Sequence, residues 1–310
     1  MKTEKITHTN EETEYRYYDK SGDASLTVCH VFDGVDISFN SVHMNVCDLA
    51  VETSGRLIEI HHCREGRLEH QHGDELVYMM PGDLAISRRR ESEDICRFPL
   101  RHYHGITIVI NEDTAPKCFS CLLKDVNVQP TKVADKLCGD NGCFVIRSQE
   151  YIEHLFSELY SVPVKYKKTY YKVKILELLL VLSWTDPDDN GLTAVALPKA
   201  QVNLAKKAAA YLAQHLDERI TQEDLAKLFN VSRAYLCNAF KGVYGVPVFQ
   251  YMRIQKIQAA ALQLIHTDRR VINIAIECGY DNPSKFASAF KEIMGETPLE
   301  YRKAHTVPTE

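Results

Sequence analysis

The chain has 310 residues, of which 45% are hydrophobic and 25% are charged, and its formal net charge at pH 7 is −5. This length predicts two domains, and the composition is that of a globular protein, which excludes broad disorder. The acidic balance excludes a protein that binds nucleic acid by charge alone. The first 20 residues lack a signal-peptide core and no apolar run is long enough to cross a membrane. We therefore expect a cytoplasmic protein whose ten cysteines are reduced.

Short apolar runs separated by Gly, Asp and Pro fill residues 1–145, and this pattern is typical of β-strands joined by tight turns. Residues 73–74 are expected to turn one hairpin and residues 81–83 the next. Many short strands of this kind indicate a small barrel or jelly roll. The expected strands cover residues 26–32, 37–44, 57–63, 67–72, 75–80, 84–87 and 104–110.

Several histidines alternate with apolar residues in these strands. Because alternate residues of a strand share a face, His62 is expected on the face of Ile60. His104 is likewise expected on the face of Ile106. Neutral imidazoles that point inward can hydrogen-bond an organic ligand or simply line the mouth of a barrel. The resulting candidates for effector binding are His62, His70, His72, His102 and His104.

Four cysteines follow the strands. Cys118 and Cys121 form a CxxC pair, and Cys138 and Cys143 follow at a spacing compatible with a zinc site. The flanking apolar residues suit ordinary packing equally well, and a reduced cysteine is often a small buried hydrophobe. We prefer the packing interpretation and expect neither a metal nor another cofactor, with the zinc interpretation kept as an alternative.

Two helices are predicted next, over residues 151–160 and 170–184, where apolar residues recur at helical spacing. The second helix is apolar nearly all round, so its own domain, a partner or both must cover it. Residues 185–199 contain the Pro, Asp and Gly typical of a linker. The predicted organisation is therefore a β-rich domain, a helical segment over residues 146–184 and a linker.

One helical pattern then occurs twice, about 50 residues apart. Phe240 and Phe290 occupy equivalent positions at this offset, as do Gly245 and Gly295. A shared register at such a distance indicates two copies of one supersecondary unit. A long helix over residues 247–265 is predicted to connect the two copies.

Each copy has the pattern of a helix-turn-helix. Thr221 and Asp224 are expected to form a capping box at the start of the first unit. Ser232 and Asn282 are expected to cap the second helix of each unit, with Pro283 at the first helical position of the later one. Two such units in register, held by one stiff helix, predict a DNA-binding domain.

Residues 202–303 closely resemble the DNA-binding domain of the AraC/XylS family of transcription regulators. The resemblance rests on Leu225, Ala226, Ser232, Leu236, Phe240, Lys241, Gly245, Tyr251, Ile274, Ala275, Gly279, Tyr280, Ser284, Phe286, Phe290, Lys291, Gly295, Pro298, Tyr301 and Arg302. It implies a sequence-specific, non-enzymatic transcription regulator with an all-α DNA-binding domain over residues 200–305 and a tail over 306–310. One departure is Pro283, which replaces a polar residue often found there.

Ahead of such a domain, residues 1–145 look like the cupin-like sensor domain common in this family, and the turn at 81–83 is similar to the one found there. The fold implied is α+β, with an N-terminal cupin-like β-barrel, a helical dimerisation segment and the all-α domain with two helix-turn-helix units. The corresponding helices commonly form the family's dimer interface, so we expect a homodimer. The expected partners are double-stranded DNA, a small-molecule effector in the barrel and, if the protein is an activator, RNA polymerase.

Two alternatives remain open. His70, His72 and Glu75 are faintly similar to the metal-binding cupin motif, although only two residues separate His72 from Glu75. The four cysteines resemble the zinc-thiolate methyl acceptor of adaptive-response DNA methyltransferases, although here they follow a β-rich domain. The alternative function is therefore a metal- or thiol-responsive regulator, or a DNA-repair methyl acceptor.

DNA contacts are predicted on the exposed face of the second helix of each unit. The base-reading candidates are Arg233, Ala234, Tyr235, Cys237, Asn238, Pro283, Ser284, Lys285 and Ser288, and the phosphate-binding candidates are Lys241, Arg253, Lys291 and Arg302. Residues 200–305 carry a balance of +4 and the remainder of the chain −9. A modestly basic domain of this kind suits a few phosphate contacts, with specificity supplied by base contacts.

Overall fold

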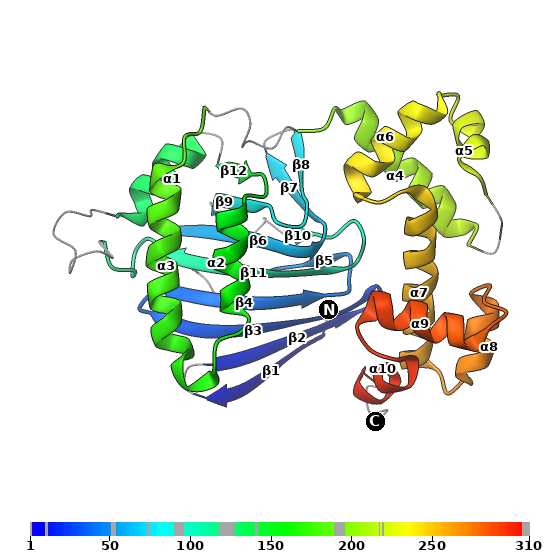
Figure 1. Cartoon of the computed structure of the whole chain (residues 1–310), viewed down its shortest axis with the longest axis horizontal. Coiled ribbons are helices and arrows are strands. Elements are labelled where there is room, and N and C mark those ends of the chain that lie inside the picture. Colours follow the sequence, from blue (N-terminus) through cyan, green and yellow to red (C-terminus); the bar gives the residue numbers. More distant parts are fainter. Residues whose placement is uncertain are drawn as a thin grey trace. The chain divides into compact units, whose positions relative to one another are not determined.

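The computed structural model describes residues 2–9, 12–50, 54–72, 75–89, 96–117, 128–139, 142–188, 196–216, 218 and 220–305. The chain divides into two compact units, Met1–Leu197 and Pro198–Glu310, and the division falls inside the predicted linker. The first unit is rich in β-strands and the second is helical, as Figure 1 shows, which confirms the predicted α+β class. Among the described residues, none of the helices combines the length and the apolar character needed to span a bilayer.

Two antiparallel sheets build the first unit. The larger runs in the order β1 (Lys2–Thr9), β2 (Glu12–Asp19), β3 (Gly22–Phe32), β4 (Val35–Val42), β11 (Tyr103–Asn111), β6 (Leu57–Gly66), β9 (Leu84–Arg89) and β12 (Cys143–Ile146). The smaller runs in the order β5 (Val46–Cys47), β10 (Cys96–Arg97), β7 (Leu68–His72) and β8 (Glu75–Met79). The predicted turn at 81–83 is present, because the Asp83 amide donates to the Met80 carbonyl at 3.0 Å. The predicted turn at 73–74 lies outside the described residues.

Apolar residues are buried on both faces of the larger sheet. On one face, Ile37 and Ile108 join a core with Phe156 and Leu179. These last two residues belong to the helices α2 (Glu150–Leu159) and α3 (Lys167–Trp184), which lie over the larger sheet in Figure 1. A short 3-10 turn, η2 (Val164–Tyr166), precedes α3, and α1 (Pro130–Cys138) completes this helical cover. On the other face, Tyr103 joins a core that includes residues of the smaller sheet. Successive residues of a strand thus enter two different cores.

The second unit contains α4 (Lys199–Gln214), α5 (Gln222–Leu228), α6 (Arg233–Tyr244), α7 (Val248–His266), α8 (Val271–Glu277), α9 (Pro283–Met294) and α10 (Pro298–His305). Helices α6 and α9 both have twelve residues and begin 50 residues apart. Gly245 and Gly295 end them at φ 75° and 81°, in the left-handed region that favours glycine. The predicted repeat and the connecting helix α7 are therefore confirmed.

Candidate nucleic-acid interface

Local hydrogen bonds fix the two helices of the first helix-turn-helix. The Thr221 amide donates to Asp224 Oδ2 at 3.0 Å, and the Asp224 amide donates to Thr221 Oγ1 at 3.2 Å. This is the predicted capping box, and it starts α5. Ser232 Oγ accepts from the Tyr235 amide at 3.2 Å and starts α6. Between the helices, Asn230 adopts φ 51°, a conformation that asparagine tolerates better than most residues.

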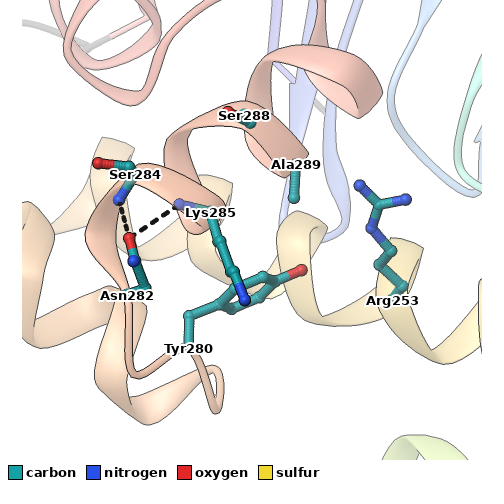
Figure 2. A pocket seen from close by; sticks show the side chains of 7 residues that line it. All are labelled: Arg253, Tyr280, Asn282, Ser284, Lys285, Ser288 and Ala289. Atoms are coloured by element: carbon teal, nitrogen blue, oxygen red, sulfur yellow. Dashed lines mark hydrogen bonds between the residues drawn. The ribbon is translucent and has the colours of Figure 1, made fainter.

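The second helix-turn-helix begins its recognition helix by the same physical means. Asn282 Oδ1 accepts from the Ser284 amide at 2.8 Å and from the Lys285 amide at 3.2 Å, as Figure 2 shows. Pro283 takes the first helical position, where its missing N–H leaves no helical bond unmade. The cap therefore fixes where α9 begins, and with it the direction in which the side chains of its first turn point.

Each recognition helix buries one face and exposes the other. Leu236, Ala239 and Phe240 of α6 are buried, as are Phe286, Ala289 and Phe290 of α9. The exposed face carries Arg233, Ala234, Tyr235 and Asn238 on α6 and Pro283, Ser284, Lys285 and Ser288 on α9, with Cys237 half-buried. The nine residues predicted to contact bases thus lie at equivalent positions of the two helices, five on α6 and four on α9.

Side chains of α5 hold Arg233 in the free protein. Arg233 Nη1 is 3.0 Å from Glu223 Oε1, and Arg233 Nε donates to Gln222 Oε1 at 3.1 Å. Cys237 Sγ lies 3.4 Å from the same Gln222 oxygen, which accepts from both residues. Any contact between Arg233 and DNA would have to replace these bonds.

The four candidate phosphate contacts differ in their surroundings. Lys241 and Lys291 are exposed in the last turn of α6 and α9. Arg253 of α7 forms an ion pair with Glu292 of α9, with 2.5 Å between Nη2 and Oε2. Arg302 has a structural role, because its guanidinium donates to main-chain carbonyls that lie far away in the sequence.

The carbonyl partners of Arg302 are those of Leu264, 3.1 Å from Nε, and Arg269, 2.6 Å from Nη2. Leu264 belongs to the last turn of α7, whose final carbonyls have no partner within the helix. Arg302 thus ties α10 to the end of the connecting helix. Its predicted phosphate contact stays a prediction.

A hollow of about 430 Å³ lies beside the second recognition helix (Figure 2). Its lining residues are Arg253, Tyr280, Asn282, Ser284, Lys285, Ser288 and Ala289. A neighbouring hollow of about 760 Å³ shares Arg253 and Tyr280 and extends to Thr221 and Arg233 of the first helix-turn-helix. The two hollows therefore adjoin along α7, between the helix-turn-helix units. Sequence reasoning missed Tyr280 as a lining residue, although the aromatic side chain after Gly279 was a visible signal.

The five candidate effector histidines do not converge on one cavity. His62 lies on the helix-covered face, where its ring stacks on Phe156 with 4.1 Å between centroids. His102 and His104 lie close together, 4.8 Å between centroids. His70 instead points into the space between the two sheets, and the side chain of His72 lies outside the described residues. For the histidines that the structure describes, sequence periodicity defined the two faces of each strand but could not say which face is covered by helices.

A buried polar network occupies the space between the sheets. His61 Nδ1 is 3.0 Å from Thr107 Oγ1 and its Nε2 is 3.1 Å from Glu59 Oε2. The Glu59 carboxylate also accepts from Arg89 at 3.2 Å. His70 lies 5.2 Å from the His61 ring, and its Nε2 is buried with no hydrogen-bond partner among the described residues. Burial lowers the pKa of His70 to about 3, so its imidazole is neutral.

Sequence reasoning missed His61, Glu59 and Thr107. The signal was present, because these polar residues alternate with isoleucines on β6 and β11. A polar residue between two apolar ones belongs to the second face of the strand, and the sequence interpretation assigned no role to that face. In fact all three are buried.

The cysteines of the alternative zinc site are only partly described. Cys118 and Cys121 lie outside the described residues. Cys138 is buried, and its thiol donates to the Ile86 carbonyl at 3.5 Å. Burial raises the pKa of Cys138 to about 11, which favours the thiol over the thiolate that binds zinc. Cys138 therefore packs as a small hydrophobic residue.

Comparison with known proteins agrees with the geometry of the second unit. A family model described as a helix-turn-helix domain matches residues 225–304. The chain is 24% identical over 256 residues to an uncharacterized HTH-type transcriptional regulator, YdeC of Bacillus subtilis, covering 80% of this chain and 81% of that protein. It is 28% identical over 106 residues to the HTH-type transcriptional activator AarP of Providencia stuartii, covering 34% of this chain and 78% of that protein.

A solved structure, the DNA-binding domain of AdpA in complex with a target DNA, shares 27% identity and a TM-score of 0.30, covering 32% of this chain and 90% of that chain. The region that the family model matches, residues 225–304, coincides with the paired helix-turn-helix units described above. Together, the family match and the relatives, which are HTH-type transcriptional regulators, identify the second unit as an AraC-type DNA-binding domain and the chain as a DNA-binding transcription regulator.

Proposed function

We propose that the regulator reads its operator by inserting α6 and α9 into successive major grooves on one face of the DNA. The observation that carries this proposal is the pair of equivalent exposed faces on two twelve-residue helices. A single continuous helix, α7, joins the two helix-turn-helix units. Successive major grooves on one face are about 34 Å, or 10 base pairs, apart.

Hydroxyl-radical footprinting of the full-length protein tests this arrangement. We expect two protected regions per protomer, about 10 base pairs apart on one face of the helix. A single protected region of a few base pairs per protomer contradicts the proposal.

Within this arrangement, the nine candidate residues on α6 and α9 contact base edges, while Lys241 and Lys291 contact phosphates. Arg253, Tyr280 and Lys285 line the hollow beside α9. Cationic and hydroxyl donors of this kind suit the phosphate backbone that crosses between two grooves. Arg253 would then exchange Glu292 for a phosphate.

We also propose a small-molecule effector site between the two sheets of the first unit. His70 supports it, because a buried ring nitrogen with no partner in the described structure is rare and calls for an explanation. A polar ligand that reaches His70 would also meet the network around His61 and Glu59. His72 remains a candidate for the same site. The ligand would act by binding two arrangements of the protein with different affinity.

A homodimer through α3 is the third part of the proposal. The buried face of α3 packs on the larger sheet, yet the opposite stripe is also apolar. On this stripe Val173 and Trp184 are 59% and 71% exposed, and Leu176 and Leu180 are half-buried. A contiguous apolar stripe suits a self-complementary contact with a second copy of the chain.

Trp184 is the only tryptophan of the chain, so its fluorescence reports on this contact directly. We expect its emission to shift to shorter wavelength as the protein is concentrated, in step with the dimer mass measured by light scattering. Val173→Glu should abolish both changes, while Tyr151→Glu, at an exposed aromatic residue of α2, should leave them intact. A Trp184 emission that is independent of protein concentration while the dimer mass forms would place the interface elsewhere.

As a regulator acting on chromosomal DNA, the protein would work in the cytoplasm. We propose that the protein activates transcription, because the relative AarP is a transcriptional activator. Activation would make RNA polymerase a partner of the bound protein.

A further inference from the structure

Three histidines gather where β4 ends and β11 begins. His43 directly follows β4, whereas His102 precedes β11 and His104 belongs to it. Val42 and Tyr103 pair in antiparallel register, so the residues next to them, His43 and His102, lie opposite each other. His104 is two residues from His102 and shares its face. The topology alone thus brings three imidazoles to one side of the sheet.

The distances between the three rings are short. The ring centroid of His43 is 5.5 Å from that of His102 and 5.4 Å from that of His104, and 4.8 Å separates the last two. One coordinating nitrogen from each residue lies within 4.8 Å of the other two. In a tetrahedral zinc site the ligand nitrogens are about 3.3 Å apart, as follows from Zn–N bonds of about 2.0 Å. Small rotations of three half-buried side chains would close this difference.

The chemical state of the rings suits coordination. Burial lowers the pKa of His102 to about 4 and lowers the pKa of His104 as well. Both imidazoles are therefore neutral at pH 7, which is the form that binds a metal. The Nδ1 atom of His102 is buried and has no hydrogen-bond partner among the described residues.

The charged neighbours of these rings include the Glu65 carboxylate and the Arg64 guanidinium. Glu65 of β6 lies opposite His104, and its Oε2 is 3.7 Å from Nε2 of His102. The Arg64 guanidinium lies over the ring of Tyr160, 4.4 Å from its centroid, and 3.8 Å from the other Glu65 oxygen. A carboxylate beside a coordinating imidazole is the usual means of orienting the ring and strengthening it as a ligand.

We propose that His43, His102 and His104 bind one divalent transition-metal ion such as Zn²⁺, Co²⁺ or Ni²⁺, with Glu65 orienting His102. Three nitrogen ligands without a thiolate favour these metals over Ca²⁺ or Mg²⁺, which prefer oxygen. The site lies on the sheet face opposite His61 and His70, so it is separate from the proposed effector site. The ion would join the end of β4 to the start of β11.

Cobalt is the sharpest probe, because its spectrum reports the ligand type. We expect one equivalent of Co²⁺ per chain in the full-length, metal-free protein. The visible bands should be those of nitrogen and oxygen ligands, without the ultraviolet charge-transfer band of a cobalt–thiolate bond. A thiolate band that appears with the first equivalent would assign binding to the cysteines and overturn the proposal.

Three substitutions locate the ion. His104→Gln and His43→Gln should each weaken binding of Co²⁺ and Zn²⁺ by more than tenfold, and Glu65→Gln by about tenfold, the size of effect typical of an orienting partner. His154→Gln is the matched control, since His154 is 74% exposed on α2. It should bind metal as the parent protein does.

Thermal unfolding separates lost binding from lost folding. Without metal, the variants should unfold at the parent temperature. Zinc should raise the midpoint of the parent and of His154→Gln most, that of Glu65→Gln less, and those of His104→Gln and His43→Gln least. If His104→Gln and His43→Gln fold normally and still bind one equivalent with parental affinity, the three-histidine site is refuted.

Discussion

Arg233, the first residue of α6, is held by Glu223 of α5 at 3.0 Å between Nη1 and Oε1. Both side chains are more than half exposed, at 62% and 54%, so this ion pair stabilises the fold by at most about 1 kcal/mol. A phosphate or a base edge can therefore displace Glu223. In the free protein, Glu223 thus occupies the Arg233 guanidinium, and DNA can replace it.

Glu223→Gln should strengthen binding of the operator by about two- to fivefold at low salt, because it frees Arg233 and removes a negative charge beside it. Affinity measured at several salt concentrations checks this. Glu277→Gln is the control, since it also breaks an exposed ion pair, with Arg269, on the helix that precedes α9. Equal gains from the two substitutions would show a general charge effect and no special role for Arg233.

Asn238→Ala should relax base preference at about one operator position and cost roughly 1–3 kcal/mol on specific DNA only. Lys291→Ala should weaken specific and random DNA alike and reduce the salt slope by about one. The measurement is a set of dissociation constants for the operator, single-base variants and random DNA across salt concentrations. Identical losses on all sequences for Asn238→Ala would contradict its assignment as a base reader.

The sequence predicted the helix ends of the second unit well because capping is local. Thr221, Ser232 and Asn282 each bond a main-chain amide two or three residues ahead, so spacing alone identifies them. The role of Arg302 could not be found this way. Its carbonyl partners lie 38 and 33 residues away, and only the folded chain brings them together.

The same limit explains the histidines of the first unit. Alternation placed His62 with Ile60 and His104 with Ile106, but apolar side chains are buried on both faces of the larger sheet. Periodicity therefore defined two faces without saying which one the helices cover. In α7, Gln255 and Gln258 are buried and bond to each other at 3.2 Å, a contact that the periodicity of apolar residues does not reveal.

Arg302→Ala should destabilise the helical unit by roughly 1–3 kcal/mol, because it leaves carbonyls at the end of α7 without their charged donor. The salt slope of DNA binding should stay unchanged. Lys303→Ala, at the exposed neighbouring residue, should change neither quantity by much. Denaturant unfolding and salt titrations of the full-length variants test this. A reduced salt slope with normal stability would instead support the phosphate contact predicted for Arg302.

Acid should destabilise the first unit through its buried histidines. Burial lowers the pKa of His62 to about 4 and that of His70 to about 3, whereas the unfolded chain binds these protons near pH 6.5. The unfolded state therefore holds more protons below pH 6.5, and stability falls as pH falls towards 4, by up to about 1.4 kcal/mol per pH unit for each histidine.

His62→Phe isolates one of these protons, since phenylalanine keeps the stack on Phe156 without the titrating ring. Urea unfolding of the first unit at pH 7.5, 6 and 5 should show a shallower pH slope for this variant by about one proton equivalent. Parallel slopes for the variant and the parent protein would mean that His62 is protonated equally in both states.

His70→Leu distinguishes a binding residue from a structural one. Because His70 Nε2 is buried with no partner in the described structure, leucine should raise the stability of the first unit by roughly 1–3 kcal/mol, the usual cost of a buried unsatisfied polar atom. The same change should abolish induction of a reporter placed behind the natural operator, under conditions in which the parent protein responds. His30→Leu, at a histidine whose side chain is 47% exposed on β3, should leave induction intact. Loss of stability together with normal induction in the folded fraction would make His70 a packing residue and move the effector site elsewhere.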